Sequence, residues 1–234
     1  MRRSTSLVLP ACLLLAGCGV GQSAQTIVAH KIADALPQAI GPAAHYDVQV
    51  SGNTLGLAQG RARGVQIRGQ DVQMTPAVTL DTLTLDARDI VFDEKSRQVR
   101  SIGSSSFAAS MGQARLSSYI AQVRPDLIVT LGSSDLQATL PVSVGPLHTT
   151  VSVRGTLVPT APGASALNFV ADQGRLGVLP VPAFAVNAAL EAVNPVLDLS
   201  RVKVPIGVQS ADVEGGMLTI RGTAQLDALS HSRE

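Results

Sequence analysis

Aromatic side chains are scarce in this chain of 234 residues, which has no Trp, 2 Tyr and 4 Phe. Carbohydrate clefts and grooves for single-stranded nucleic acid depend on aromatic faces for stacking, so both kinds of site are disfavoured. The 18 basic and 17 acidic residues nearly balance, without a long run of either sign. This charge pattern gives no nucleic-acid footprint, and we expect no nucleic-acid partner.

Cysteine is almost absent as well, with Cys12 and Cys18 as the 2 examples. Both lie in an amino-terminal segment interpreted below as a signal peptide and a lipid attachment site. The mature chain would then have no disulfide, and its stability must come from a packed core. Four histidines are scattered along the sequence: His30, His45, His148 and His231. Their spacing fits no metal motif, so we expect no metal and no other cofactor.

The amino terminus has the layout of a signal peptide. Arg2 and Arg3 precede an apolar run at 7–16, which Pro10 interrupts. The run is shorter than the roughly 20 residues that cross a bilayer. It ends in Leu15-Ala16-Gly17-Cys18, which resembles the lipobox of bacterial lipoproteins. Small residues before Cys18 admit the backbone to a peptidase cleft, and the thiol of Cys18 can carry diacylglycerol.

These features predict an exported lipoprotein that is cut before Cys18 and anchored in the cell envelope through lipid on Cys18. No second apolar stretch approaches membrane-spanning length. The expected organisation is a signal peptide at 1–17, a lipidated tether at 18–22 and a single domain at 23–230. Gly19 follows Cys18 where an Asp would favour inner-membrane retention. In a diderm organism this predicts the outer membrane or its periplasmic face.

The interior is expected to be aliphatic, because 45% of the residues are hydrophobic while 3% are aromatic. Walls of Ala, Val, Leu and Ile suit acyl chains. An ordinary dry core has the same composition, so composition alone leaves both interpretations open.

Three helices are expected from the apolar spacing. The first runs from a capping Ser23 to about residue 39, before Gly41-Pro42 stops it. Its apolar stripe is Val28, Ile32, Leu36 and Ile40, and we expect Pro37 to kink or end it. The second covers 113–123 and precedes Pro125, and the third covers 183–193 after Pro182.

Elsewhere the apolar residues alternate, which is typical of half-buried strands. Strands are expected near 46–50, 65–67, 72–74, 78–80, 83–85, 127–131, 136–140, 142–144, 151–157, 202–208 and 217–225. Glycines are interpreted as turns between them, at Gly52, Gly103, Gly132, Gly145 and Gly215-Gly216. The short intervals favour antiparallel hairpins, so the predicted class is α+β with a long, meandering antiparallel sheet.

One short pattern recurs at 65–69, 151–155 and 218–222, in the form aliphatic-x-aliphatic-Arg-Gly. The favoured interpretation is a strand followed by a turn, with Arg68, Arg154 and Arg221 on the solvated face. The alternative is an arginine site for a lipid headgroup.

The search for catalytic motifs predicts no enzyme. No G-x-S-x-G elbow occurs, and the similar segment 103–106 is interpreted as a flexible turn. Ser200 and Lys203 match S-x-x-K, but they open a strand pattern and lack a K-T-G partner. One acidic cluster could hold calcium, although a solvated face is favoured. It consists of Asp81, Asp86, Asp89, Asp93 and Glu94.

The order of several segments resembles the LmeA-like family of envelope phospholipid-binding proteins. They are the N-terminal helix, Asp47-Val-Gln-Val-Ser-Gly52, 65–69, 83–93, 103–119 with Phe107, Leu116 and Tyr119, and the closing 212–222. The resemblance covers most of 23–226. It implies a fold like that of tubular lipid-binding domains, in which a long twisted antiparallel sheet wraps two or three helices and leaves an apolar channel. The lipobox departs from the family pattern.

The resemblance implies that the partner is a phospholipid or another acyl lipid, for envelope lipid transport or maintenance. It offers no catalytic residues to carry over. We expect the channel where the first and third helices face the concave sheet, lined by Val28, Ile32, Leu36, Tyr119, Phe184, Leu190 and Val193. The alternative function is a non-catalytic envelope scaffold that binds other proteins.

Overall fold

The computed structural model describes residues 20–92, 99–144, 147–176, 178–182, 186–187, 190–191 and 194–226, with side chains from residue 25 onward except 142–149. The signal segment, Cys18, Phe184 and Val193 lie outside this part of the chain.

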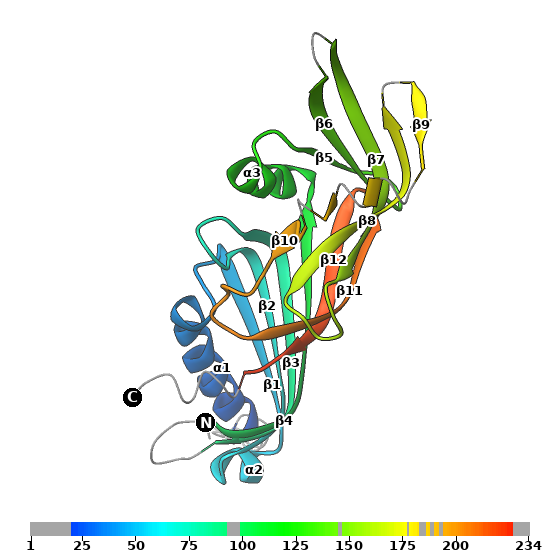
Figure 1. Ribbon diagram of the computed structural model, residues 1–234. Coiled ribbons are helices and arrows are strands. Elements are labelled where there is room, and N and C mark those ends of the chain that lie inside the picture. Colours follow the sequence, from blue (N-terminus) through cyan, green and yellow to red (C-terminus); the bar gives the residue numbers. More distant parts are fainter. Residues whose placement is uncertain are drawn as a thin grey trace, which may run out of the picture.

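Two antiparallel sheets lie end to end in an elongated molecule (Figure 1). The first sheet has the order β1-β2-β3-β4-β12-β11. Its strands are β1 (His45–Ser51), β2 (Arg61–Gln73), β3 (Thr79–Phe92), β4 (Val99–Gly112), β11 (Ile206–Glu214) and β12 (Met217–Ala224). The second sheet has the order β10-β8-β7-β6-β5, and β9 also pairs with β8. Its strands are β5 (Ile128–Leu131), β6 (Leu136–Val144), β7 (Leu147–Pro159), β8 (Ala166–Leu176), β9 (Leu179–Val181) and β10 (Leu197–Asp198).

The α+β class and the antiparallel pairing are therefore confirmed, but the single meandering sheet is wrong. The chain builds two sheets because long strands twist strongly, and twisted open sheets split or curl before they exceed about ten strands. The change of sheet occurs at α3 (Gln113–Val123), which follows β4 and precedes β5. Leu116 and Ile120 of α3 are fully buried, so this helix fills the junction between the sheets.

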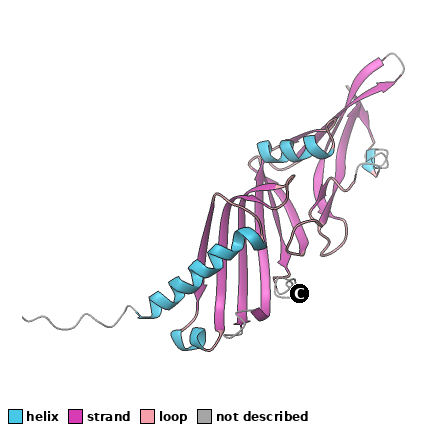
Figure 2. Cartoon of the chain, turned by 90° about the vertical axis from the view of Figure 1, so that its left-hand side faces the viewer, coloured by secondary structure: helices cyan, strands magenta, loops and turns pink. Residues whose placement is uncertain are grey.

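Helix α1 (Val20–Ala39) lies along one face of the first sheet, against β1 (Figure 2). It begins before Ser23, so the predicted cap at Ser23 is wrong, and it continues through Pro37. The chain turns sharply at Gly41, where a Cβ atom would lie 2.0 Å from the carbonyl oxygen of Gln73. Only glycine allows this approach. A short helix, α2 (Thr54–Ala58), was not expected, and Asn53 caps it by accepting a hydrogen bond from the Gly56 amide.

Two aspartates explain why the alternation in β2 and β3 breaks. Asp71 and Asp89 have φ angles of 51° and 53°, in the left-handed region that Asp tolerates better than most residues. Each one reverses the order of inward and outward side chains. Val65 and Val72 thereby face the same core despite their odd separation. The separate short strands expected from the sequence are parts of β2 and β3.

The recurring Arg-Gly pattern is strand interior, and the expected turn after each strand is wrong. Arg68, Arg154 and Arg221 are exposed, as predicted, but Gly69, Gly155 and Gly222 are buried within β2, β7 and β12. Two of the glycines lie beneath an aromatic ring of the paired residue. Gly69 pairs with Tyr46 and Gly222 with Phe107. A ring that covers a strand glycine is a known way to stabilise such positions.

Other expectations fail for related reasons. Gly103 and the serines after it lie inside β4, because Gly103 sits opposite the left-handed Asp89, where a Cβ atom would be tightly packed. The strand expected at 202–208 is wrong at its start, since β11 begins at Ile206. Strand β8 was not anticipated. Of the third helix, the described residues 186, 187 and 190 are helical.

Candidate functional site

Between the two sheets, residues 199–205 form a connection from β10 to β11, which we call the strap. Leu199, Val202 and Val204 are buried, whereas Ser200, Arg201, Lys203 and Pro205 are exposed. The strap therefore presents one apolar side to the first sheet and one polar side to solvent. This alternation explains its strand-like sequence. Pro205 has no amide hydrogen to donate to a strand partner.

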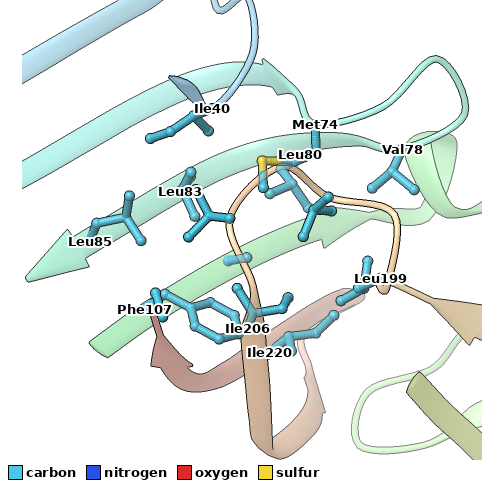
Figure 3. Close-up of a pocket in the computed structure, with 14 residues that line it drawn as sticks. Ile40, Met74, Val78, Leu80, Leu83, Leu85, Phe107, Leu199, Ile206 and Ile220 are labelled. Atoms are coloured by element: carbon cyan, nitrogen blue, oxygen red, sulfur yellow. The ribbon is translucent and has the colours of Figure 1, made fainter. Parts of the chain in front are cut away.

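The strap covers a small apolar cavity on the first sheet, and all side chains around the cavity are apolar (Figure 3). They come from the end of α1, from β2 to β4, from β12 and from the strap region. The lining consists of Ile40, Met74, Val78, Leu80, Leu83, Leu85, Phe107, Ala109, Leu199, Val202, Val204, Ile206, Ile220 and Ala224. The cavity volume is about 30 Å³. Ligand pockets usually measure about 300–1,000 Å³, so this space is too small to hold a ligand as it stands.

The opposite face of the same strands is polar, so the apolar side chains of the first sheet are concentrated on the face under the strap. Thr82 and Ser110 form a hydrogen bond of 2.5 Å across β3 and β4, and Gln66 donates to Asp86 across β2 and β3 at 2.9 Å. Neighbouring residues such as Leu83 and Leu85 point the other way, into the cavity (Figure 3). The first sheet is thus amphipathic.

Few polar contacts hold the strap down. Its exposed Lys203 donates from Nζ to the carbonyl oxygen of Gln38 at 2.8 Å, in the last turn of α1. A cation there is favoured by the helix dipole. At the end of the strap, the Gln225 amide donates to the Pro205 carbonyl at 2.8 Å. Within the described residues, the middle of the strap, 200–204, makes no backbone hydrogen bond to the first sheet. The cover is held mainly by apolar contact.

A second concave feature lies between α1 and β1, the edge strand of the first sheet. It is an open groove of about 430 Å³. Its lining is mixed and consists of Gln25, Thr26, Ala29, His30, Ala33 and the six residues of 45–50. Tyr46 donates from its hydroxyl to the Gly41 carbonyl at 2.8 Å, and burial raises the pKa of Tyr46 to about 12. The groove has the volume of a ligand site but a more polar wall than the cavity under the strap.

The structure does not bring the predicted channel residues into one wall. Val28, Ile32 and Leu36 lie along α1, with Leu36 buried and the other two partly exposed. Tyr119 is buried on α3, where its hydroxyl accepts from the Asp198 amide at 3.2 Å. Leu190 packs against the core from the segment beside β8. None of these five lines the apolar cavity. Phe184, Val193 and the lipidation residue Cys18 lie outside the described residues.

The candidate chemical motifs have structural partners. Lys203 contacts Gln38, as described, and the Ser200 amide donates to Asp198 at 2.8 Å. Hydrogen bonds from Ser200 hold the pKa of the Asp198 carboxyl below its usual range. In the acidic cluster, Asp81 accepts from the Gly112 amide at 2.6 Å and lies 3.5 Å from Arg115. Thus Asp81 anchors the start of α3.

Among the described residues, no group of three or more His, Cys, Asp or Glu side chains could hold a metal ion. His30 and His45 are exposed. The side chain of His148 and the whole of His231 are not described. In the part of the chain that the structure covers, no helix is both long and apolar enough to span a bilayer.

Comparison with known proteins gives one clear relationship. The family model for LmeA-like phospholipid-binding proteins matches residues 19–223, which include every described helix and both sheets. No curated protein and no solved structure matches the chain. This chain therefore belongs to the LmeA-like phospholipid-binding family.

Proposed function

We propose that the protein is an envelope lipoprotein that holds acyl chains of a phospholipid between the first sheet and the strap. The observation that carries this proposal is the wholly apolar lining of the cavity, on a sheet face covered by a weakly attached segment. Family membership supports the class of ligand. The family resemblance to tubular lipid-binding domains suggests the same use of an apolar space enclosed by sheet and helices.

Binding requires the strap to move outward, because about 30 Å³ cannot hold an acyl chain. If the strap moves outward alone, Leu199, Val202 and Val204 become exposed to water. An acyl chain between strap and sheet would cover these side chains, and each methylene that it buries contributes roughly 0.8 kcal/mol to the binding free energy. Lipid and strap would then share the apolar face of the sheet.

The lipid anchor forms the second part of the proposal. Signal-like residues, the lipobox and the position of Cys18 support attachment to an envelope membrane. Two or more acyl chains on Cys18 would make the attachment stable. We expect Cys18→Ser to abolish labelling by a palmitate analogue in cells and to leave an uncleaved precursor. Equal labelling of wild type and variant would exclude Cys18 as the attachment site.

The cavity is tested by a phospholipid with a photoreactive group in its acyl chain. In the purified wild-type protein, we expect crosslinked peptides to contain the cavity walls, from β3, β4, β12 and the strap. Crosslinks confined to 25–50 would place the lipid in the groove between α1 and β1. An absence of crosslinks, together with an absence of copurified lipid by mass spectrometry, would contradict lipid binding.

A matched pair of alanines separates filling of the cavity from general overpacking. Ala109 lines the cavity, whereas Ala138 is buried to a similar extent in the second sheet. Replacement of either by Leu should cost about 1–3 kcal/mol of unfolding free energy. Only Ala109→Leu should also lower lipid crosslinking per folded molecule. Equal crosslinking by both variants would refute the proposed location.

A non-catalytic scaffold that binds other proteins is the second candidate, and the small volume of the closed cavity favours it. A scaffold fills its interior at the density of an organic crystal and has no need to open. The wild-type crosslinking experiment decides between the two functions.

A further inference from the structure

Near the far end of the second sheet, beside the ends of β6 and β7, a hairpin carries an exposed apolar tip (Figure 1). Strands β8 and β9 form a hairpin in which Leu176 pairs with Leu179. Leu176, Val178 and Leu179 are 37%, 89% and 63% exposed. They account for three of the ten large apolar side chains that are exposed among the described residues. Single exposed apolar residues are common on protein surfaces, but three within four positions on one turn form a patch.

The chemistry beside the patch is cationic. Arg175 immediately precedes Leu176, is exposed, and makes no ion pair with any residue that the structure describes. A protruding apolar turn with a neighbouring cation matches a bilayer surface, where acyl chains lie beneath anionic phosphates. A stable protein interface needs about 800 Å² from each partner, and it requires a broader surface than one hairpin tip.

The position of the tip also favours a membrane. The β8–β9 hairpin lies toward the end of the long axis opposite the first turns of α1, next to the end of β6 and β7 (Figure 1). A molecule held at its amino terminus would thus present the hairpin away from its own attachment point. We propose that the β8–β9 tip, through Leu176, Val178 and Leu179, docks into the surface of a phospholipid bilayer. This docking is separate from lipid binding under the strap and does not require it.

The test uses the full chain with an environment-sensitive dye on Val178→Cys. In an unlipidated protein, Cys12 and Cys18 are replaced by Ser so that the dye reacts at position 178 alone. Acceptor vesicles contain phosphatidylethanolamine and phosphatidylglycerol, with spin-labelled phospholipid as a quencher. The protein is in quencher-free vesicles if it is lipidated and in solution if it is not, so quenching reports contact with acceptor vesicles in either case. The matched control is the same dye on Ile128→Cys, because Ile128 is 62% exposed but lies on β5.

We expect quenching at position 178 and little at 128. Leu179→Asp should weaken acceptor binding about ten-fold or more, because the apolar contact of one Leu is lost and a charge is added beside the phosphates. Ile128→Asp should leave it unchanged. Circular dichroism should show both variants folded, since both side chains are exposed. Equal quenching at 178 and 128, no quenching at either, or equal effects of the two Asp variants would overturn bilayer docking. Binding of the tip to another protein, without any quenching by vesicles, would also overturn bilayer docking.

Discussion

The two sheets differ in how their apolar faces are covered. Beside β8, Asn187 exchanges two hydrogen bonds with the backbone of Ala171, and Asn194 exchanges two with the backbone of Phe169. These side chains imitate a paired strand and fix the covering segment in place. Among the described residues, the strap over the first sheet has no such bonds from 200–204, and Lys203 makes its polar contact with α1. The comparison suggests that the cover of the second sheet is permanent and that the strap is removable.

The largest effect should come from a pair of phenylalanines, one in each sheet. Phe169 is 2% exposed in the second sheet, and Phe107 is 6% exposed beside the cavity. Truncation of a buried Phe to Ala typically costs about 3–5 kcal/mol. We expect Phe169→Ala near the upper end and Phe107→Ala near the lower end, because the strap can settle into the space that the Phe107 ring leaves. Chemical denaturation measures both values.

Lipid retention makes the same pair more informative. Phe107→Ala should raise the phospholipid bound per folded molecule, because it widens the apolar space. Phe169→Ala should leave this ratio unchanged. If Phe107→Ala and Phe169→Ala lose the same stability and bind the same amount of lipid, the strap is no more removable than the segment that covers the second sheet.

The next largest loss of stability should come from Asn187, which fixes the segment beside β8. Asn187→Leu keeps the size of the side chain but leaves the Ala171 amide and carbonyl without their partners. Each buried polar group that loses its partner costs about 1–3 kcal/mol, so the melting temperature should fall by several degrees. Lipid binding should persist in the folded fraction. Asn168→Leu on the same strand is the control, because the structure gives that side chain no hydrogen bond within the described residues. A similar loss in both variants would contradict the pinning role.

Local patterns bounded by strong stop signals were predicted well. The expected helix at 113–123 has the bounds of α3, and the expected end of the first helix coincides with that of α1. Pro125 and Gly41-Pro42 terminate these helices through their own backbone restrictions, which depend little on tertiary contacts. The same holds for Gly215-Gly216, where positive φ angles form the turn before β12.

Glycines inside strands could not be distinguished from turn glycines. At Gly222 a Cβ atom would lie 2.0 Å from the Gly207 carbonyl oxygen on β11, and at Gly103 it would lie 3.0 Å from the Asp89 side chain on β3. Such contacts depend on strand register, which a single sequence does not specify. The recurring Arg-Gly pattern did mark these buried glycines, because each one follows an exposed arginine at the same position. The pattern does not show which neighbouring strand packs against the glycine.

The cavity was hidden for a similar reason. Its walls combine residues 40, 74–109, 199–206 and 220–224, and no local pattern links them. The strap resembled a strand because burial of alternate residues produces the same period in both. Of the predicted stripe Val28, Ile32, Leu36 and Ile40, the last residue lines the cavity, whereas α1 itself lies against β1.

A smaller effect is expected at Tyr46, which holds the end of α1 over the first sheet. Its pKa of about 12 in the folded protein exceeds the ordinary value of 10, so the folded state binds the hydroxyl proton more tightly than the unfolded state. This contribution is complete below pH 10 and is lost as the pH rises from 10 to 12. Tyr46→Phe should cost about 0.5–1.5 kcal/mol at neutral pH through the lost bond to Gly41.

The same variant should flatten the alkaline part of the melting curve. Thermal melting from pH 7 to pH 12 measures both effects, since the wild type should approach the variant as the pH rises. A constant difference between the two proteins up to pH 12 would show that Tyr46 does not carry the pH dependence.

The smallest effect on stability should come from Lys203→Met, which keeps the aliphatic stem and removes the cation from the Gln38 carbonyl. Lys203 is exposed, so an interaction with the helix end contributes about 0.3–1 kcal/mol. A population shift of that size opens the strap about two- to five-fold more often. Hydrogen exchange at the Gln225 amide, which donates to the Pro205 carbonyl at the end of the strap, should accelerate by that factor. Exchange at Val208, whose amide donates to Ala164 at 2.9 Å, should not change.

Lipid kinetics complete this test of the comparison. If the strap is the cover that lipid displaces, Lys203→Met should speed the uptake of a fluorescent phospholipid by the same two- to five-fold. Arg201→Met is the control, because Arg201 is also an exposed cation of the strap but has no contact with α1 among the described residues. Faster exchange without faster uptake would mean that the strap opens but does not admit lipid. That result would favour the groove between α1 and β1 as the entrance, because its volume of about 430 Å³ is within the range of ligand sites.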